Sequence, residues 1–152
     1  MIAAIRVRGC VNLNHDIKRA LAQLNLNRVN RLNIVPDTKE NRKMVKKTEN
    51  YITWGEIDAE LIARILAKRG RVSISKKLSV EYLKEKKISS FKELAEKIEA
   101  GASPQSFGLK PFFGLKPPSK GYDRKGIKKS FSIGGALGYR GKEISKLINR
   151  MI

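Results

Sequence analysis

Short strand-like and helix-like patterns alternate along the first seventy residues, and this alternation limits the chain to folds in which helices pack on a small sheet. Residues 5–8 alternate Ile and Val with Arg, the period-two pattern of a strand with one buried face. Asn14 is placed to cap a helix. The apolar residues of that helix recur at the spacing of one buried face: Ile17, Ala20, Leu21 and Leu24.

Two further strands are predicted before residue 56. The first is a β-rich run over residues 28–35 that closes at Pro36. Val29 is out of phase with the alternation that follows it, which allows a bulge or an irregular start. The second covers residues 51–55.

Helices are predicted between and after these strands. Residues 37–40 have the composition of a helix start and lead into a short, very basic helix through Val45. Asp58 is expected to cap a helix that stops at Gly70 in the left-handed conformation. Residues 79–100 add two helices, and the second begins with the capping box 90–93.

These elements predict an α+β protein whose first part is a two-layer sandwich, with helices on one face of the sheet and the other face or a sheet edge left for a partner. We divide the chain into a core at 1–57, a helical segment and added lobe at 58–101, and a basic extension at 102–152 that ends in a helix. The extension begins where composition changes, because nine of the twelve glycines and four of the five prolines follow residue 100.

Charge points to a polyanionic partner. The 152 residues contain 33 Lys and Arg against 14 Asp and Glu, a formal charge of +19. The excess lies at the two ends of the chain, with six bases and one acid in residues 1–35 and eleven bases and two acids in residues 101–152. The amino terminus has no leader-like pattern, and no apolar run approaches the roughly 18 residues of a membrane span, so we expect a cytoplasmic protein.

The residue types that carry catalysis or bind metals are scarce. One cysteine and one histidine, Cys10 and His15, exclude an internal disulfide and a Cys/His zinc cluster. No nucleophile or metal partner accompanies His15, so we expect a surface or capping histidine, and Cys10 is expected to be a small buried residue. We therefore assign no catalytic residue, no metal and no cofactor. Trp54 is expected in the core, whereas Tyr139, among Gly and Arg, is the best stacking candidate.

Two features of the last third could contact nucleic acid. Phe-Gly-Leu-Lys-Pro occurs at 107–111 and again at 113–117, which predicts an extended segment that is either an anchored loop or a contact strand. Residues 122–129 place four bases around a glycine, and four glycines follow at 134–141 before a closing helix. That run fits neither a P-loop nor a dinucleotide fingerprint. Residues 130–134 are expected to form a strand.

Residues 121–138, Gly-Tyr-Asp-Arg-Lys-Gly-Ile-Lys-Lys-Ser-Phe-Ser-Ile-Gly-Gly-Ala-Leu-Gly, closely resemble the carboxy-terminal signature of the archaeal and eukaryotic branch of a large-subunit ribosomal protein family, called L-thirty, or L-seven in eukaryotes. Residues 6–9, 24–26 and 51–55 resemble the core that bacterial members share. The likeness covers essentially the whole chain. One departure is Lys43, where the family often has a small residue.

The resemblance implies a ferredoxin-like β-α-β-α-β core embedded in ribosomal RNA of the large subunit, with no enzymatic activity. The expected partners are large-subunit ribosomal RNA and neighbouring large-subunit proteins, and contact with the small ribosomal RNA of that subunit stays open. The expected RNA-binding residues are Arg6, Arg8, Asn12, Asn14, Arg28, Arg31, Arg42, Lys43, Lys46, Lys47, Arg124, Lys125, Lys128, Lys129 and Arg140.

Two other functions stay open at this point. A non-ribosomal basic protein that binds nucleic acid would carry the same charge without the carboxy-terminal signature. An enzyme or a small-molecule-binding ferredoxin-like module would use the same fold. The field of +19 disfavours the second, because it lowers carboxylate pKa values and makes these groups poor proton donors.

Overall fold

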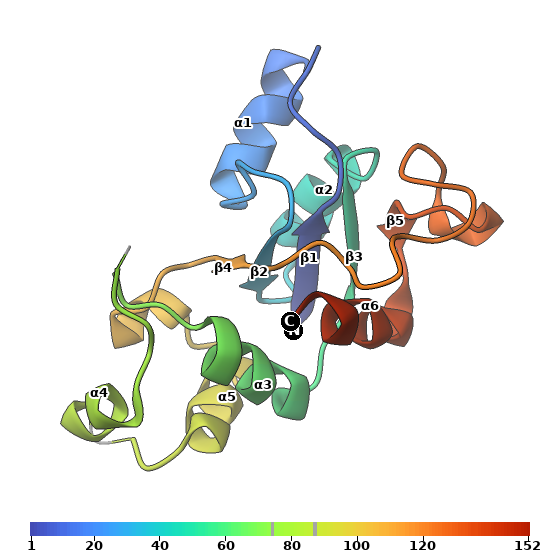
Figure 1. The fold of residues 1–152 in the computed structure, drawn as a ribbon. Coiled ribbons are helices and arrows are strands. Elements are labelled where there is room, and N and C mark those ends of the chain that lie inside the picture. The colour runs from blue at the N-terminus through green and yellow to red at the C-terminus, as the bar shows by residue number, and fades with distance from the viewer. Residues whose placement is uncertain (74, 87) are drawn as a thin grey trace.

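A five-stranded mixed sheet forms the centre of the protein. The computed structural model describes residues 1–73, 75–86 and 88–152. Strand β1 (Ile2–Arg6) lies between β2 (Arg31–Val35) and β3 (Ile52–Glu56) and is antiparallel to both. Beyond β2, the antiparallel strand β4 (Phe113–Gly114) forms one edge, and the parallel strand β5 (Gly138–Tyr139) forms the other edge beyond β3 (Figure 1). The predicted α+β class is confirmed.

Strand β1 is buried along its whole length, on both faces of the sheet. Its side chains alternate, because successive residues of a strand point to opposite faces. Ala3 and Ile5 belong to one apolar cluster, and Ile2 and Ala4 belong to another. The sheet therefore needs a covering layer on each side.

Helices α1 (His15–Gln23) and α2 (Lys39–Lys47) cover the same face, which confirms the predicted two-layer β-α-β-α-β core. Both begin where the sequence predicts. The Asn14 side chain accepts a 3.1 Å bond from the Asp16 amide, and the Thr38 hydroxyl accepts a 3.2 Å bond from the Asn41 amide. The apolar residues of this layer include Leu21, Leu24, Leu26, Val45 and Trp54.

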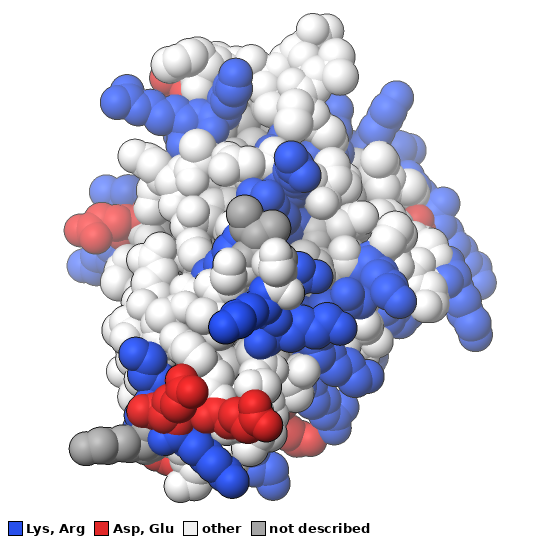
Figure 2. Space-filling view, turned by 60° about the vertical axis from the view of Figure 1, so that its left-hand side comes forward, with Lys and Arg blue, Asp and Glu red and all other residues white. Residues whose placement is uncertain are grey.

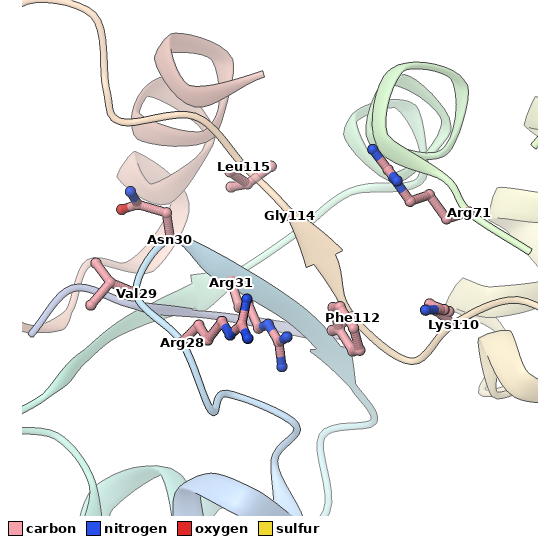
Figure 3. A pocket seen from close by; sticks show the side chains of 9 residues that line it. All are labelled: Arg28, Val29, Asn30, Arg31, Arg71, Lys110, Phe112, Gly114 and Leu115. Atoms are coloured by element: carbon pink, nitrogen blue, oxygen red, sulfur yellow. The ribbon is translucent and has the colours of Figure 1, made fainter. Parts of the chain in front are cut away.

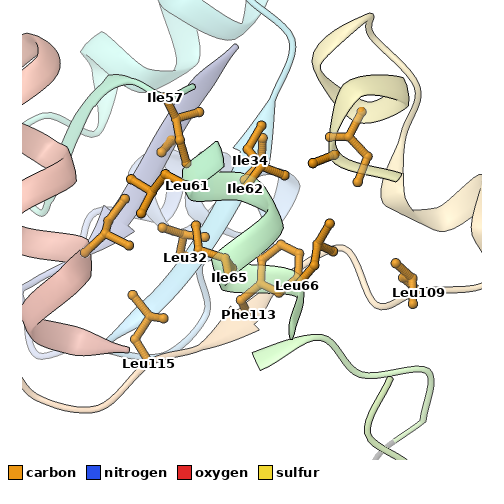
Figure 4. Close-up of a cluster of buried hydrophobic side chains, with 14 of the residues drawn as sticks. Leu32, Ile34, Ile57, Leu61, Ile62, Ile65, Leu66, Leu109, Phe113 and Leu115 are labelled. Atoms are coloured by element: carbon orange, nitrogen blue, oxygen red, sulfur yellow. The ribbon is translucent and has the colours of Figure 1, made fainter. Parts of the chain in front are cut away.

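The opposite face is covered by α3 (Ala59–Arg69), α5 (Phe91–Glu99) and α6 (Ile144–Met151). Figure 4 shows Leu32 and Ile34 of β2 facing Ile62 and Ile65 of α3. The sequence left either this face or a sheet edge for a partner, and the first of these alternatives is wrong. The reason is that β1 and β2 carry apolar side chains on both faces, and water would otherwise contact one of the two sets.

The smaller helices connect these layers. They are α4 (Val80–Glu85) and the 3-10 turns η1 (Pro104–Phe107), η2 (Phe131–Ile133) and η3 (Gly141–Glu143). The predicted start of α5 is confirmed, since the Ser90 hydroxyl accepts a 3.2 Å bond from the Glu93 amide. The Glu93 carboxylate accepts bonds from Lys97 and from the Ser89 amide, and these bonds lower its pKa.

Three local predictions are wrong. The strand predicted at residues 130–134 does not form, and Phe131–Ile133 form η2 instead, because the backbone there bonds across its own loop, with the Gly135 amide 2.8 Å from the Ser130 carbonyl. Gly70 has φ −57° and not the left-handed conformation. Cys10 is exposed, because β1 ends at Arg6 and the chain then turns outward.

The duplicated Phe-Gly-Leu-Lys-Pro segment is anchored on the apolar layer beside α3. Leu109, Phe113 and Leu115 are buried, whereas Lys116 is exposed (Figure 4). Phe113 lies in β4 and pairs with Leu32 of β2. Anchoring of the segment is thus confirmed, and the segment adds a strand to the sheet.

A substitution at Gly55 tests how tightly the carboxy-terminal part of the chain packs against β3. A β-carbon at this position would lie 2.1 Å from the Gly141 carbonyl oxygen and 3.1 Å from the Ile144 side chain. We predict that Gly55→Ala lowers the free energy of unfolding by about 1–3 kcal/mol, the usual cost of overpacking. Gly9→Ala is the control, because nothing lies within 4 Å of its β-carbon position. Chemical denaturation measures both, and equal stability of the two variants would contradict the packing.

Candidate nucleic-acid interface

Basic side chains are exposed at several places around the sheet. Figure 2 shows Lys and Arg concentrated across the middle of one face, with acidic side chains mainly toward its lower and left margins. The predicted site residues fall into four groups: the beginning of β2, the end of β1 with the loop that follows it, helix α2, and residues 121–140, which include β5.

The first group lies in a basic groove of about 540 Å³ between β2 and β4 (Figure 3). Backbone pairing builds this groove. Arg31 pairs with Gly114 in the sheet, and the Leu115 amide donates a 2.9 Å bond to the Asn30 carbonyl. The Lys110 amide donates a 2.9 Å hydrogen bond to the Arg71 carbonyl, and this bond brings a third segment of the chain to the groove. The lining residues are Arg28, Val29, Asn30, Arg31, Arg71, Lys110, Phe112, Gly114 and Leu115.

An arginine stacked on an aromatic ring forms the floor of the basic groove. The Arg31 guanidinium carbon lies 4.0 Å from the centroid of the Phe112 ring, and the Lys110 ammonium lies 5.8 Å from it. Burial and the neighbouring charge of Arg28 lower the pKa of Arg31. An arginine stays charged even so. The groove is therefore positive and carries an aromatic surface.

The sequence prediction included Arg28 and Arg31 but missed Phe112 as part of the site. The sequence does contain a signal that Phe112 faces away from the core. Residues 112 and 113 are adjacent phenylalanines in an extended segment, so if Phe113 points into the core, Phe112 must point away from it. Arg71 was also missed, since it is 40 residues from Arg31 and only the tertiary fold brings it to the groove.

The tail loop, residues 121–137, presents four exposed bases: Arg124, Lys125, Lys128 and Lys129. Its backbone is folded on itself. The Lys125 amide bonds the Gly134 carbonyl at 3.2 Å, and the Ala136 amide bonds the Gly126 carbonyl at 3.1 Å. Gly135 must be glycine, because a β-carbon there would lie 2.1 Å from the Lys129 carbonyl oxygen. The four bases thus project from a defined frame.

Arg140 does not join these bases, because it is buried beneath the tail loop. It is 6% exposed and forms an ion pair with Asp123. It also donates bonds to the Thr53 hydroxyl at 2.8 Å and to the Ala136 carbonyl at 3.1 Å, and it lies 4.4 Å from the centroid of Phe131. These contacts hold the tail loop to β3.

Arg6 is also internal. It is 2% exposed, and its guanidinium donates to the Leu26 carbonyl at 2.7 Å and to the Arg8 carbonyl at 2.9 Å. It therefore organises the end of β1. Arg8 is partly exposed, with its guanidinium 5.1 Å from the centroid of Tyr51, and Asn12 and Asn14 are exposed in the loop that leads to α1.

The bases of α2 are exposed, but two of them have acidic partners. Arg42 donates two hydrogen bonds to Asp37, and this pairing lowers the pKa of the Asp37 carboxyl. Lys47 lies 3.7 Å from Asp16. Lys43 and Lys46 are exposed on the same helix. Exposed pairs of this kind contribute only about 0–1 kcal/mol.

The structure gives two further observations. Within the described part of the chain, no group of three or more His, Cys, Asp or Glu side chains is placed to hold a metal ion. None of the helices in residues 1–73, 75–86 and 88–152 is long and apolar enough to span a membrane.

Comparison with known proteins places these features in a family. Residues 2–52 match the family described as "Ribosomal protein L30p/L7e". The chain is 52% identical to "Large ribosomal subunit protein uL30" of Nanoarchaeum equitans, over 100% of this chain and 99% of that protein. The protein of the same name from Methanococcus maripaludis is 47% identical, over 99% and 98% of the two chains. This chain belongs to the L30p/L7e family. The resemblance seen in the sequence is confirmed.

The two kinds of match cover different parts of the structure. The L30p/L7e model covers β1, α1, β2, α2 and the first residue of β3. The archaeal relatives match over nearly their full length, which includes β4, the tail loop and α6. The basic groove therefore joins a strand inside the region of the family model to one outside it.

Arg140 and Arg124 separate a buried role from an exposed one. We predict that Arg140→Ala lowers the free energy of unfolding by roughly 3 kcal/mol or more, because it leaves Asp123 without its partner in a partly buried site. Arg124→Ala is the control and should change that free energy by less than about 0.5 kcal/mol, since Arg124 is exposed. Denaturant titration compares the two, and a larger loss for Arg124→Ala would refute the assignment.

Proposed function

We propose that this chain is a structural constituent of the large ribosomal subunit that binds ribosomal RNA and works in the cytoplasm, within the ribosome. Membership of the L30p/L7e family supports this function. The physical observation that carries it is the excess of exposed bases on a folded frame in a chain of charge +19. A surface of this kind needs a polyanion to offset its own repulsion.

The proposed mechanism is phosphate neutralisation by bases held in a fixed register. Lys and Arg replace condensed counterions at phosphates, and the release of those ions favours binding. The frame decides which phosphates are reached, because double-stranded RNA is recognised mainly through its shape and backbone. The proposed contact residues are Arg8, Asn12, Asn14, Arg28, Arg31, Arg71, Lys110, Arg42, Lys43, Lys46, Lys47, Arg124, Lys125, Lys128 and Lys129.

Arg6 and Arg140 are left out of this contact set. Both were expected to bind RNA, and both are buried with their guanidinium groups bonded inside the protein. We assign them to positioning the end of β1 and the tail loop. A buried guanidinium could reach phosphate only after these internal bonds break.

The role is structural, and we propose no catalysis. His15 is exposed at the start of α1, and the sequence indicates no nucleophile that could pair with it. The small ribosomal RNA of the large subunit and neighbouring large-subunit proteins are further proposed partners. Charge fits either RNA partner equally well, because phosphates are the same in both.

Cosedimentation tests the proposal. The chain should remain with purified large subunits at moderate salt, and large-subunit RNA should displace it from duplex DNA. Retention on duplex DNA in the presence of that RNA would instead support the alternative of a non-ribosomal nucleic-acid-binding protein.

The tail loop gives a quantitative prediction. Replacing Arg124, Lys125, Lys128 and Lys129 together by Ala should make the plot of log affinity against log salt shallower by about 3 units, because each phosphate contact contributes roughly 0.7 to 0.9. The occupancy of this variant in washed large subunits should fall as well. The thermal midpoint should change little, since the four side chains are exposed.

A second quadruple variant controls for loss of charge alone. Lys68, Lys84, Lys86 and Lys92 are exposed on or beside α3, α4 and α5, outside the proposed contact set. Their replacement by Ala should affect the salt slope much less. If the two quadruple variants have the same slope, overall charge and not the tail loop accounts for binding.

A further inference from the structure

We propose that the basic groove binds an unpaired RNA nucleotide, whose base stacks on the Arg31 guanidinium and whose phosphate contacts Arg28 and Lys110. This inference rests on the proposed function and makes it more specific. It names single-stranded RNA as the ligand of one defined surface, whereas the tail loop and α2 meet phosphates of any RNA.

The stacking platform is already assembled in the protein. The Arg31 guanidinium lies 4.0 Å from the Phe112 ring centroid, so the ring supports one side of the guanidinium. Arg31 is only partly buried and lines the groove (Figure 3). Unstacked RNA bases bind to aromatic rings and to the planes of arginine side chains. A base on Arg31 would extend a stack that the fold has fixed, which reduces the entropy lost on binding.

Charge supplies the phosphate contacts. Arg28 lies beside Arg31 in Figure 3, and the Lys110 ammonium approaches the same ring from the other end of the groove. None of the described residues that line the groove is acidic. The repulsion between Arg28 and Arg31, which also lowers the Arg31 pKa, is therefore not offset by a lining carboxylate. A phosphate placed between these cations would offset it.

The apolar surface of the groove favours an unpaired nucleotide over a duplex. Val29, 41% exposed, and Phe112 both line it. A duplex would offer these side chains only phosphate and sugar, because its base faces are stacked on each other. The groove volume of about 540 Å³ lies in the range of sites for single small ligands. An unpaired nucleotide can meet both the apolar and the cationic surface.

The experiment measures binding of the full chain to a labelled single-stranded uridine oligomer of about eight nucleotides and to an RNA duplex of the same length, by fluorescence anisotropy. Arg31→Lys keeps the positive charge but removes the planar guanidinium, and Phe112→Leu removes the aromatic ring that this guanidinium contacts. Each should weaken single-strand binding about 5- to 100-fold. Duplex binding should change less than about twofold, because no stacking is lost there.

Matched controls separate stacking from fold and charge. Phe91→Leu removes an aromatic ring that packs against the apolar layer around α3 and lies outside the groove, and Lys92→Gln removes an exposed charge on α5. Neither should affect single-strand binding. Phe112→Tyr keeps the ring and should retain that binding, so it tests the proposal even if Phe112→Leu unfolds.

Three results would overturn the proposal. Equal losses on the single strand and the duplex would make the groove a plain phosphate site. Competition by inorganic polyphosphate as effective as by the oligomer at equal charge would do the same. Displacement of the oligomer by an acidic peptide at equal concentration would indicate a protein partner.

The wild-type chain separates this inference from the proposed function. If wild type does not cosediment with large subunits, the proposed function fails. If it does, and Arg31→Lys and Phe112→Leu bind the single strand as well as wild type, only the groove inference fails.

Discussion

Burial of β1 on both faces is the constraint on which the rest of the structure depends. A five-residue strand with apolar side chains on both faces of the sheet needs a covering layer on each face. The helices of the first 57 residues cover only one of these faces. The second layer comes from α3, α5 and α6, so the chain after residue 100 must return to the sheet. That return places β4 beside β2 and β5 beside β3, and it thereby forms the basic groove and positions the tail loop.

A chain of charge +19 can fold because its cations occupy two different kinds of surroundings. Arg6 and Arg140 are inside, where backbone carbonyls accept their hydrogen bonds and Asp123 pairs with the second. The other bases in the proposed contact set lie at the surface, where the surrounding solution screens their repulsion. Internal arginines thus stabilise the frame, and the exposed bases are available to RNA.

The basic groove and the tail loop present charge in different ways. In the tail loop, turns and close glycine contacts hold a short segment in shape, and its four bases point outward. In the groove, two strands far apart in the sequence bring cations to an aromatic ring. The first arrangement suits the backbone of any RNA, whereas the second suits a base as well as a phosphate. Together they would let one small protein hold a paired and an unpaired segment at a fixed separation.

The sequence by itself determined the order of strands and helices as far as residue 99, the caps at Asn14 and Ser90, the anchoring of Phe113 and Leu115, and the excess of positive charge. Local hydrogen bonds and apolar periodicity carry that information, and they act over a few residues. Tertiary structure alone decided that the second face is covered, that Arg140 is buried while Arg124 is exposed, and that Arg31 lies over Phe112 in a groove that Arg71 also lines. An arginine has the same charge in either place, and only the long-range packing of the sheet determines whether water, a carbonyl or an RNA phosphate will contact it.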